Sequence, residues 1–371
     1  MKEVQLLLFF VMSISGFSQS SVELIITVHN IDSDTLILAK SHEDLRYHGL
    51  MIPVENNTQI EYSFIPDFIE EYVLVYNSEH KNGAYRPIVF FPSSSQIEFE
   101  LYPSNEYDKN MIIGDDLGNR KKAYRASFGN KFMKIGNEIY GSFFSSEENS
   151  AEMNSAKIRL DSLNAAALEY HHEYFKDDIS ILGLNEYVEI LQNAEQMKIE
   201  PAALQIYHQE IIKKEFNHPL TERANNLFTA LTSLKVGEKY ANIQLENAFQ
   251  SSIELSDKIK PGEYTLLDLW TPWCGPCIRK SKRLKDSYSN FEDRLNVVGI
   301  VGGVNSLDDA VKAIEKHKYP WSTYIEISDK NDIWAKYNIS RSGGAQFLID
   351  DSGIIVSINP TIEELHTYLN K

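Results

Sequence analysis

The chain has 371 residues, of which 43% are hydrophobic and 24% are charged, and its formal net charge is −17 at pH 7. This length predicts two or three domains, and the apolar content is sufficient to build their cores without disulfides. The negative charge disfavours nucleic-acid binding. Beyond the N-terminus there is no apolar run long enough to predict a membrane span in the mature chain.

The first residues resemble a secretory signal peptide. Lys2 precedes an apolar run, and Gly16 and Ser18 fit the small positions before a cleavage site. We therefore expect residues 1–18 to be removed by cleavage after Ser18 and the protein to be periplasmic, with secretion as the alternative. A buried N-terminal strand or helix is the competing interpretation, because Glu3 weakens the basic start.

Residues 19–110 are predicted to form a small antiparallel β-rich N-terminal domain. Its β-prone runs are "SVELIITV", "DTLILA", "EYVLVY", "RPIVFF" and "QIEFELY". Turn-prone segments such as "NIDSD", "PVENN" and "NSEHKNG" separate them.

Residues 111–235 are predicted to form a helical region. Leu163, Ala167, Tyr170 and Tyr174 recur at helical spacing, which predicts a buried stripe. The pair His171 and His172 lacks the H-E-x-x-H spacing of metalloproteases, so we interpret both as exposed helix residues. The segment "FNHPLT" offers a proline and a threonine cap for a further helix.

Residues 236–371 alternate between predicted strands and helices. The apolar runs "YTLLDLW" and "LNVVGIVG" flank a helix whose apolar face includes Ile278, Leu284 and Tyr288. The runs "AQFLID" and "GIIVSI" flank "DSG", a pattern typical of a hairpin, and "TIEELHTYL" is typical of a Thr-capped helix. Together these elements predict a mixed sheet flanked by helices.

The only two cysteines, Cys274 and Cys277, lie at the turn of the predicted βαβ unit. A disulfide closing so short a loop contributes only about 2 kcal/mol, less any strain, which favours a chemical role over a structural one. A single C-x-x-C is also half of a zinc site. No second such motif is present, so a metal site would need a dimer, and none is expected.

These segments resemble the TlpA-like, AhpC/TSA-related branch of the thioredoxin superfamily, which comprises exported thiol-disulfide oxidoreductases. The resemblance rests on "VGEKYANIQL", "LLDLWTPWCGPC", "FLIDDSGIIV", Tyr337 and Ile339, and it covers residues 236–371. It implies an α/β thioredoxin-like fold at the C-terminus, preceded by the β-plus-helical extension often fused to such domains. It also implies protein or peptide disulfides as substrates, an unidentified thiol electron donor and no cofactor.

By this resemblance, Cys274 and Cys277 form the redox-active disulfide. Cys274, at the start of a helix, is the nucleophile, because unpaired N–H groups and the helix dipole favour its thiolate. We expect it to be exposed, with a lowered pKa. Cys277, one turn later and more buried, is the resolving thiol. Asp268 lies in an apolar strand, where burial raises its pKa, and it is the predicted acceptor of the Cys277 proton. A backbone cap is the alternative role for Asp268.

The predicted substrate-binding residues are Trp273, Gly275, Pro276 and Gly344. Trp273 shields the nucleophile and contacts substrate, whereas Trp270 is expected in the core. Gly275 lets a substrate backbone approach, and Pro276 suits an early helical position. Family members usually carry a cis-proline at the position of Gly344, but the loop "SRSGGAQ" has no proline. The peptide bond before Gly344 is therefore expected to be trans, with a different loop shape and an altered site for substrate docking.

Basic side chains follow the cysteines along the helix and are expected to form a solvated surface: Arg279, Lys280, Lys282, Arg283 and Lys285.

Three functions remain open at this stage. The first is reduction of protein disulfides, favoured because Gly-Pro between the cysteines resembles the reducing thioredoxins. The second is a peroxidase, since "TPWC" contains T-x-x-C, although Leu267 stands where peroxiredoxins carry proline. The third is a partner-binding protein whose redox domain contributes mainly structure.

Overall fold

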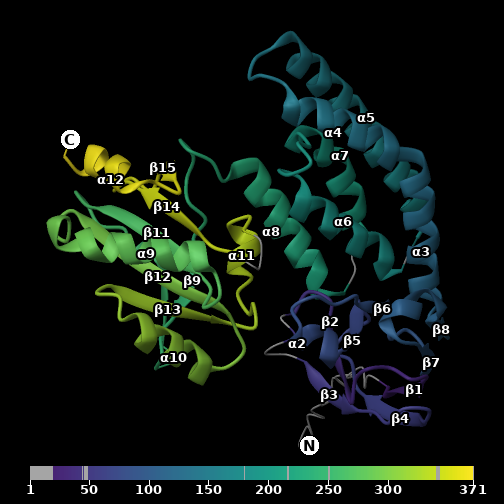
Figure 1. Ribbon diagram of the computed structural model, residues 1–371. Helices are drawn as coiled ribbons and strands as arrows, with labels where there is room; N and C mark the ends of the chain where they lie inside the picture. Colours follow the sequence, from purple (N-terminus) through teal and green to yellow (C-terminus); the bar gives the residue numbers. More distant parts are fainter. Residues whose placement is uncertain are drawn as a thin grey trace, which may run out of the picture. The chain divides into compact units, whose positions relative to one another are not determined.

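The computed structural model describes residues 20–43, 45, 49–178, 180–214, 217–249, 251–339 and 343–370 (Figure 1). The chain divides into two compact units. One is built from residues up to 38 and from 51–116, and the other from 39–50 and 117–371. The expected signal peptide, residues 1–18, lies outside the described residues.

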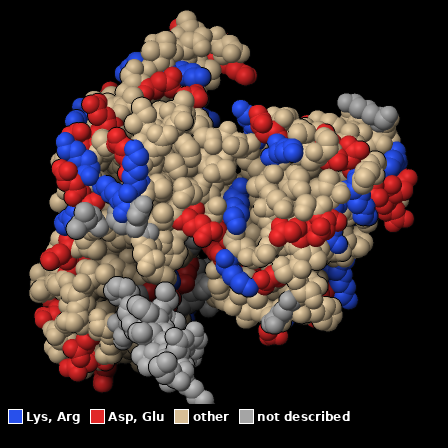
Figure 2. All heavy atoms as spheres, turned by 180° about the vertical axis from the view of Figure 1, so that it is seen from behind, with Lys and Arg blue, Asp and Glu red and all other residues tan. Residues whose placement is uncertain are grey.

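On the face drawn in Figure 2, Lys and Arg side chains alternate with Asp and Glu side chains. None of the helices in the described part of the chain is long and apolar enough to span a bilayer.

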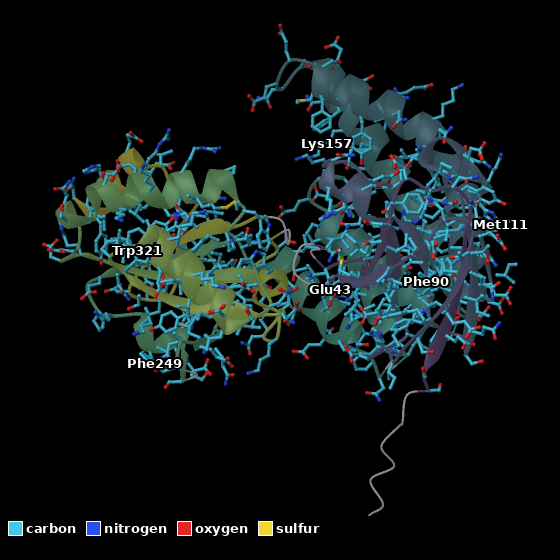
Figure 3. The ribbon with its side chains drawn as sticks, turned by 60° about the horizontal axis from the view of Figure 1, so that its bottom comes forward. Glu43, Phe90, Met111, Lys157, Phe249 and Trp321 are labelled. Carbon is cyan, nitrogen blue, oxygen red and sulfur yellow. A yellow bond between two sulfur atoms is a disulfide. The ribbon has the colours of Figure 1, made fainter. Side chains whose placement is uncertain are left out.

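The first unit contains two four-stranded sheets, ordered β4-β1-β7-β8 and β3-β2-β5-β6. The strands are β1 (Val22–Val28), β2 (Thr35–Lys40), β3 (Leu50–Pro53), β4 (Gln59–Phe64), β5 (Tyr72–Tyr76), β6 (Ile88–Phe90), β7 (Gln96–Leu101) and β8 (Met111–Ile113). Alternate residues of β1 are buried, as expected for a strand with one face in a core. Side chains of both sheets, such as Leu24 and Phe90, share that core (Figure 3).

All five predicted strands of this unit are present, but their pairing is not wholly antiparallel. β1 pairs antiparallel with β4 but parallel with β7. The strands β3, β4 and β8 were not predicted. β3 and β8 have only four and three residues, too short for a clear alternation. The predicted turn "NSEHKNG" includes a short helix, α2 (Asn77–Lys81).

Helices dominate the described part of residues 116–233, as predicted. The helices are α3 (Asp116–Phe128), α4 (Lys134–Ser145), α5 (Ala151–Phe175), α6 (Ile181–Asn193), α7 (Pro201–Ile212) and α8 (Pro219–Ser233), with the π-helical turn η2 (Gly129–Met133) between α3 and α4. Pro219 is the first residue of α8, as predicted, but His218 rather than Thr221 caps it.

The predicted stripe on α5 is wrong by one residue. The buried positions are Ala156, Leu160, Asn164, Leu168, His171 and Phe175. Tyr174 is 40% exposed, and the stripe shifts because the buried face includes the polar Asn164 and His171, which a search for apolar spacing passes over.

The predicted exposure of His171 is also wrong, because this side chain is fully buried. Its Nδ1 lies 2.8 Å from the Tyr124 hydroxyl. Burial lowers the pKa of His171 to about 3, so the ring is neutral and able to occupy the interior.

Residues 244–370 contain a seven-stranded mixed sheet ordered β10-β9-β13-β12-β11-β14-β15. The strands are β9 (Gln244–Glu246), β10 (Ser252–Glu254), β11 (Tyr264–Trp270), β12 (Leu295–Val304), β13 (Ser322–Ile327), β14 (Ala345–Ile349) and β15 (Ile355–Ile358). β11, β12 and β13 are parallel, whereas β14 pairs antiparallel with both β11 and β15. The predicted βαβ unit and hairpin are therefore present.

Helices cover both faces of this sheet. They are α9 (Gly275–Ser287), α10 (Leu307–His317), α11 (Ile333–Lys336) and α12 (Ile362–Leu369), with the 3₁₀ turns η3 (Leu255–Lys258) and η4 (Tyr288–Asn290). α9 and α12 pack on one face through Leu284 and Leu365. α11 packs on the other through Trp334. Thr361 caps α12 in a capping box, as its sequence predicts.

Candidate active site

The two cysteines stand where the central strand β11 gives way to α9. Cys274 is the N-cap of this helix, and it is joined to Cys277 by a disulfide with 5.3 Å between the Cα atoms. The backbone N–H of Cys277 donates to Cys274 Sγ at 3.3 Å. The first sulfur therefore lies at the unsatisfied N–H groups of a helix start, which favour negative charge.

The predicted order of exposure of the cysteines is reversed in this disulfide form. Cys274 is only 7% exposed, whereas Cys277 is half-buried. The reason is the capping geometry: Cys274 Sγ turns back to bond Cys277 Sγ and to accept the Cys277 N–H.

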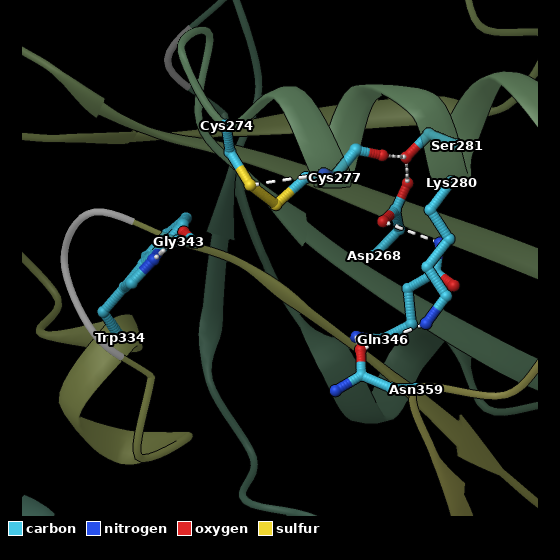
Figure 4. The surroundings of a disulfide bond; sticks show 9 residues. All are labelled: Asp268, Cys274, Cys277, Lys280, Ser281, Trp334, Gly343, Gln346 and Asn359. Carbon is cyan, nitrogen blue, oxygen red and sulfur yellow. Dashed lines mark hydrogen bonds between the residues drawn. A yellow bond between two sulfur atoms is a disulfide. The ribbon is translucent and has the colours of Figure 1, made fainter.

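Asp268 lies on β11 and is 1% exposed. Its carboxylate has two side-chain partners (Figure 4): Ser281 Oγ donates to Oδ2 at 2.7 Å and Gln346 Nε2 donates to Oδ1 at 3.0 Å. Burial raises the pKa of Asp268, and these two hydrogen bonds oppose the rise. Ser281 Oγ also lies 3.1 Å from the carbonyl oxygen of Cys277, so one side chain connects the carboxyl group to the backbone of Cys277.

Lys280 provides a positive charge near this carboxyl group. Burial lowers the pKa of Lys280, and the charge of Asp268 opposes that shift. Its Nζ donates to Asn359 Oδ1 at 3.2 Å. The same Asn359 oxygen accepts the backbone N–H of Gln346 at 3.0 Å, so Asn359 connects Lys280 to the strand that carries Gln346.

Two tryptophans lie against a pair of glycines at the end of β12. A Cβ at Gly303 would come within 2.5 Å of the Trp273 ring, and one at Gly302 within 2.3 Å of the Trp334 ring. Any larger residue at either glycine would displace an indole. Trp270, in contrast, is fully buried, as predicted.

Gly344 packs against the end of β11. A Cβ there would lie 2.0 Å from the Leu269 carbonyl oxygen, so this backbone path excludes any side chain, including a proline ring. The Trp334 indole N–H donates to the neighbouring Gly343 carbonyl at 2.9 Å. The peptide bond before Gly344 is trans, as expected, since the described residues contain no cis bond.

The remaining predicted positions surround the helix start. Gly275 is half-exposed and Pro276 is exposed. The structure therefore brings the predicted residues to one end of the central strands, either beside the disulfide or against the end of β11. Figure 4 shows Trp334 and Gly343 on one side of the disulfide, and Asp268, Lys280 and Ser281 on the other.

Sequence reasoning missed Ser281, Gln346 and Trp334. The first two carry a signal: Ser281 follows Cys277 by one helical turn on a buried face, and Gln346 is a polar residue in an apolar strand. Trp334 carries none, because its role depends on a contact with Gly343. Among the described residues, no group of His, Cys, Asp or Glu is arranged to hold a metal ion.

A disulfide at a helix start, next to a buried carboxyl group, suits thiol-disulfide exchange. Residues 236–358 match the model of the AhpC/TSA family. This part of the chain is a thioredoxin-like oxidoreductase domain of the thiol-disulfide type.

Similar proteins include two named thiol-disulfide oxidoreductase ResA. Those of Bacillus subtilis (strain 168) and Bacillus thuringiensis subsp. konkukian (strain 97-27) are 25% and 26% identical over 150 and 147 residues. Each match covers 39% of this chain, and 80% or 82% of the relative.

Solved structures give matches of similar extent. The thioredoxin domain of thiol-disulfide oxidoreductase BVU-2223 from Bacteroides vulgatus is 26% identical, with a TM-score of 0.33, over 37% of this chain and 97% of that one. A thiol:disulfide interchange protein from Bacteroides sp. is 24% identical, also with a TM-score of 0.33, over 37% of this chain and 91% of that one.

Proposed function

We propose that this protein is exported and reduces protein disulfides through Cys274 and Cys277. The observation that carries the proposal is the position of this cysteine pair, at the start of α9 and connected through Ser281 to the buried Asp268. Export rests on the signal-like residues 1–18, and it favours a periplasmic location, with secretion as the alternative.

The proposed reaction has two steps. The Cys274 thiolate attacks one sulfur of the substrate disulfide, that S–S bond breaks, and the leaving thiolate takes a proton. Cys277 then gives its proton to Asp268 and attacks Cys274 Sγ, which releases the second substrate thiol. Two electrons pass from the enzyme dithiol to the substrate disulfide, and an external thiol donor restores the Cys274–Cys277 dithiol.

The surrounding residues have proposed roles in binding. Trp273, Gly275 and Pro276 are the residues that we expect to contact the substrate next to Cys274. Gly344 lies where family members align the substrate backbone on a proline loop, and its close packing on Leu269 leaves the backbone without a side chain at this point.

The test is reduction of insulin with a dithiol donor by the wild type, Cys274→Ser and Cys277→Ser. We expect turnover in the wild type and its loss in Cys274→Ser. Cys277→Ser should accumulate a mixed disulfide with the substrate, detectable by mass spectrometry, because the resolving thiol is missing. Insulin reduction that is equal in the wild type and Cys274→Ser would contradict the proposal.

Peroxide reduction is the second candidate, and the match to the AhpC/TSA family favours it. The Leu267 side chain, however, stands where the peroxidase motif has proline. Consumption of hydrogen peroxide, followed in parallel samples with the same donor, distinguishes the two activities.

A further inference from the structure

Three basic side chains of α9 line a hollow next to the dithiol. The hollow has a volume of about 520 Å³ and lies between α9 and the start of α12. Arg279, Lys280 and Arg283 contribute to its lining, as does Pro276 from the Cys-Gly-Pro-Cys turn. A molecule in this hollow would therefore contact the turn that carries both cysteines.

The charge of this hollow is predominantly positive. Glu363 is the one carboxylate side chain in its described lining. Within the described part of the chain, neither Arg279 nor Arg283 forms an ion pair within 4.0 Å, and Lys280 donates only to the neutral Asn359. Charge attraction without an ion pair acts between Arg283 and Glu363, and between Lys280 and both Asp268 and Glu364. The lining still holds more cations than carboxylates, and an excess of cations around a concave surface attracts anionic groups. Since the whole chain carries a net charge of −17, this positive hollow differs in sign from the protein as a whole.

The hollow also extends to Gln346, which forms a hydrogen bond with Asp268. Gln346 lines it, and the same side chain donates to Asp268 Oδ1 at 3.0 Å. An occupant would thus lie between the CGPC turn and the residue that positions the proposed proton acceptor.

We infer that this hollow binds an acidic segment of a polypeptide substrate, next to the cysteine that reacts with Cys274. The inference deepens the proposed function and rests on it for the identity of the reacting group. The occupant is a polypeptide because the dithiol exchanges with cysteine sulfur, and it is acidic because Arg279 and Arg283 offer charges that Glu or Asp side chains would satisfy.

Direct binding tests the hollow without requiring turnover. Fluorescence anisotropy of the full chain is measured with two labelled, cysteine-free peptides, one containing four Glu residues and the other four Gln at the same positions. We expect the Glu peptide to bind about fivefold more tightly at low salt. This preference should shrink as salt increases, because exposed charges are screened.

Two double variants remove the same charge from the same helix. Arg279→Gln with Arg283→Gln should bring the ratio of the two affinities close to one. Lys282→Gln with Lys285→Gln, which lie outside the lining of the hollow, should retain the preference. Equal binding of both peptides by the wild type, or an equal loss in both double variants, would overturn the inference.

The rate of disulfide reduction distinguishes a failure of this inference from a failure of the proposed function. Peptides with one internal disulfide and either Glu or Gln flanks are reduced by the wild type with a dithiol donor. A higher kcat/KM for the Glu-flanked peptide supports both statements, and equal values overturn the hollow as a substrate site. If the Glu peptide binds preferentially but neither disulfide is reduced, the proposed function and the substrate assignment fail together. The hollow then stands only as a binding site for acidic peptides.

Discussion

Asp268 and Gln346 lie directly opposite each other on the antiparallel strands β11 and β14, and Gln346 Nε2 donates to Asp268 Oδ1 at 3.0 Å. Two buried polar residues in strand register are costly unless they satisfy each other. Here the Gln346 side-chain amide and the Ser281 hydroxyl each donate a hydrogen bond to one of the two carboxylate oxygens. Burial still raises the pKa of Asp268, so the ionised carboxyl group lowers the stability of the fold, and a group kept at such a cost is a candidate for a chemical role.

Asp268→Asn should separate stability from activity. Because the folded-state pKa is raised above the ordinary 3.8, the carboxyl group destabilises the fold as pH rises above 3.8 and through the folded-state pKa. Asparagine removes the cost of ionising a buried carboxyl group, and its side-chain amide can still form hydrogen bonds with Ser281 and Gln346. We expect a higher free energy of unfolding at pH 7 in urea denaturation, and insulin reduction slower by about tenfold or more.

The control for this variant is its pH profile. At pH 3, where the carboxyl group is protonated in both states, Asp268→Asn and the wild type should have similar free energies of unfolding. A variant that is less stable than the wild type at pH 7 would show that the ionised carboxylate is stabilising. A variant with an unchanged rate of insulin reduction would exclude Asp268 as the proton acceptor.

Trp334→Phe should lower the free energy of unfolding, because it removes a hydrogen bond to the segment at 343–344. The variant retains a ring over Gly302 but loses the N–H that donates to the Gly343 carbonyl. We compare it with Trp321→Phe, because Trp321 is also buried but its Nε1 has no hydrogen-bond partner among the described residues. Trp334→Phe should lower the free energy of unfolding by about 1 kcal/mol more than Trp321→Phe. Equal losses in urea denaturation would assign the role of Trp334 to packing alone.

Gly344→Ala should be poorly tolerated. The added methyl group would meet a backbone oxygen, Leu269 O, at 2.0 Å, so β11 or the segment at 343–344 must move. We expect a loss of about 1–3 kcal/mol in the free energy of unfolding. Gly141→Ala in α4 is the control: its Cβ meets nothing within 4 Å, and alanine favours a helix by about 1 kcal/mol. A neutral Gly344→Ala would show that the segment has room to shift.

Periodicity and turn chemistry in the sequence predicted most of the C-terminal fold. The βαβ unit of β11, α9 and β12, the hairpin of β14 and β15, the capping box at Thr361 and the place of the cysteines at a helix start all follow from local patterns. The strands β9, β10 and β13 and the short helix α11 were not predicted. What the sequence could not supply depends on contacts between distant segments. The pairing of Asp268 with Gln346 is set by the register of two strands, and the burial of His171 by its Tyr124 partner.

The loop around Gly344 shows the same limit more sharply. The sequence showed that a proline was missing, but not that a side chain at this position would meet the Leu269 carbonyl oxygen, because that contact joins two distant segments. The prediction of which cysteine is exposed was wrong for a local reason: in the disulfide form, Cys274 Sγ turns inward to cap α9 by accepting the Cys277 N–H.

Glu326→Gln should change how stability depends on pH. Glu326, on β13, is fully buried, and it accepts hydrogen bonds from the backbone N–H and the side-chain amide of Asn331 at 2.7 and 2.9 Å. Burial raises its pKa from the ordinary 4.5 to about 7. Because the folded-state pKa is raised, stability is greatest below pH 4.5 and falls as the pH rises to about 7, by on the order of 2–3 kcal/mol.

Glutamine, which never ionises, should remove this fall, since the Asn331 amide can rotate to present its oxygen to the new N–H group. Urea denaturation at several pH values between 4 and 8 measures the effect, and Glu315→Gln, which removes an exposed carboxylate of α10, is the control. A wild type and a Glu326→Gln variant with parallel stability curves over this range would show that folding does not shift the pKa of Glu326.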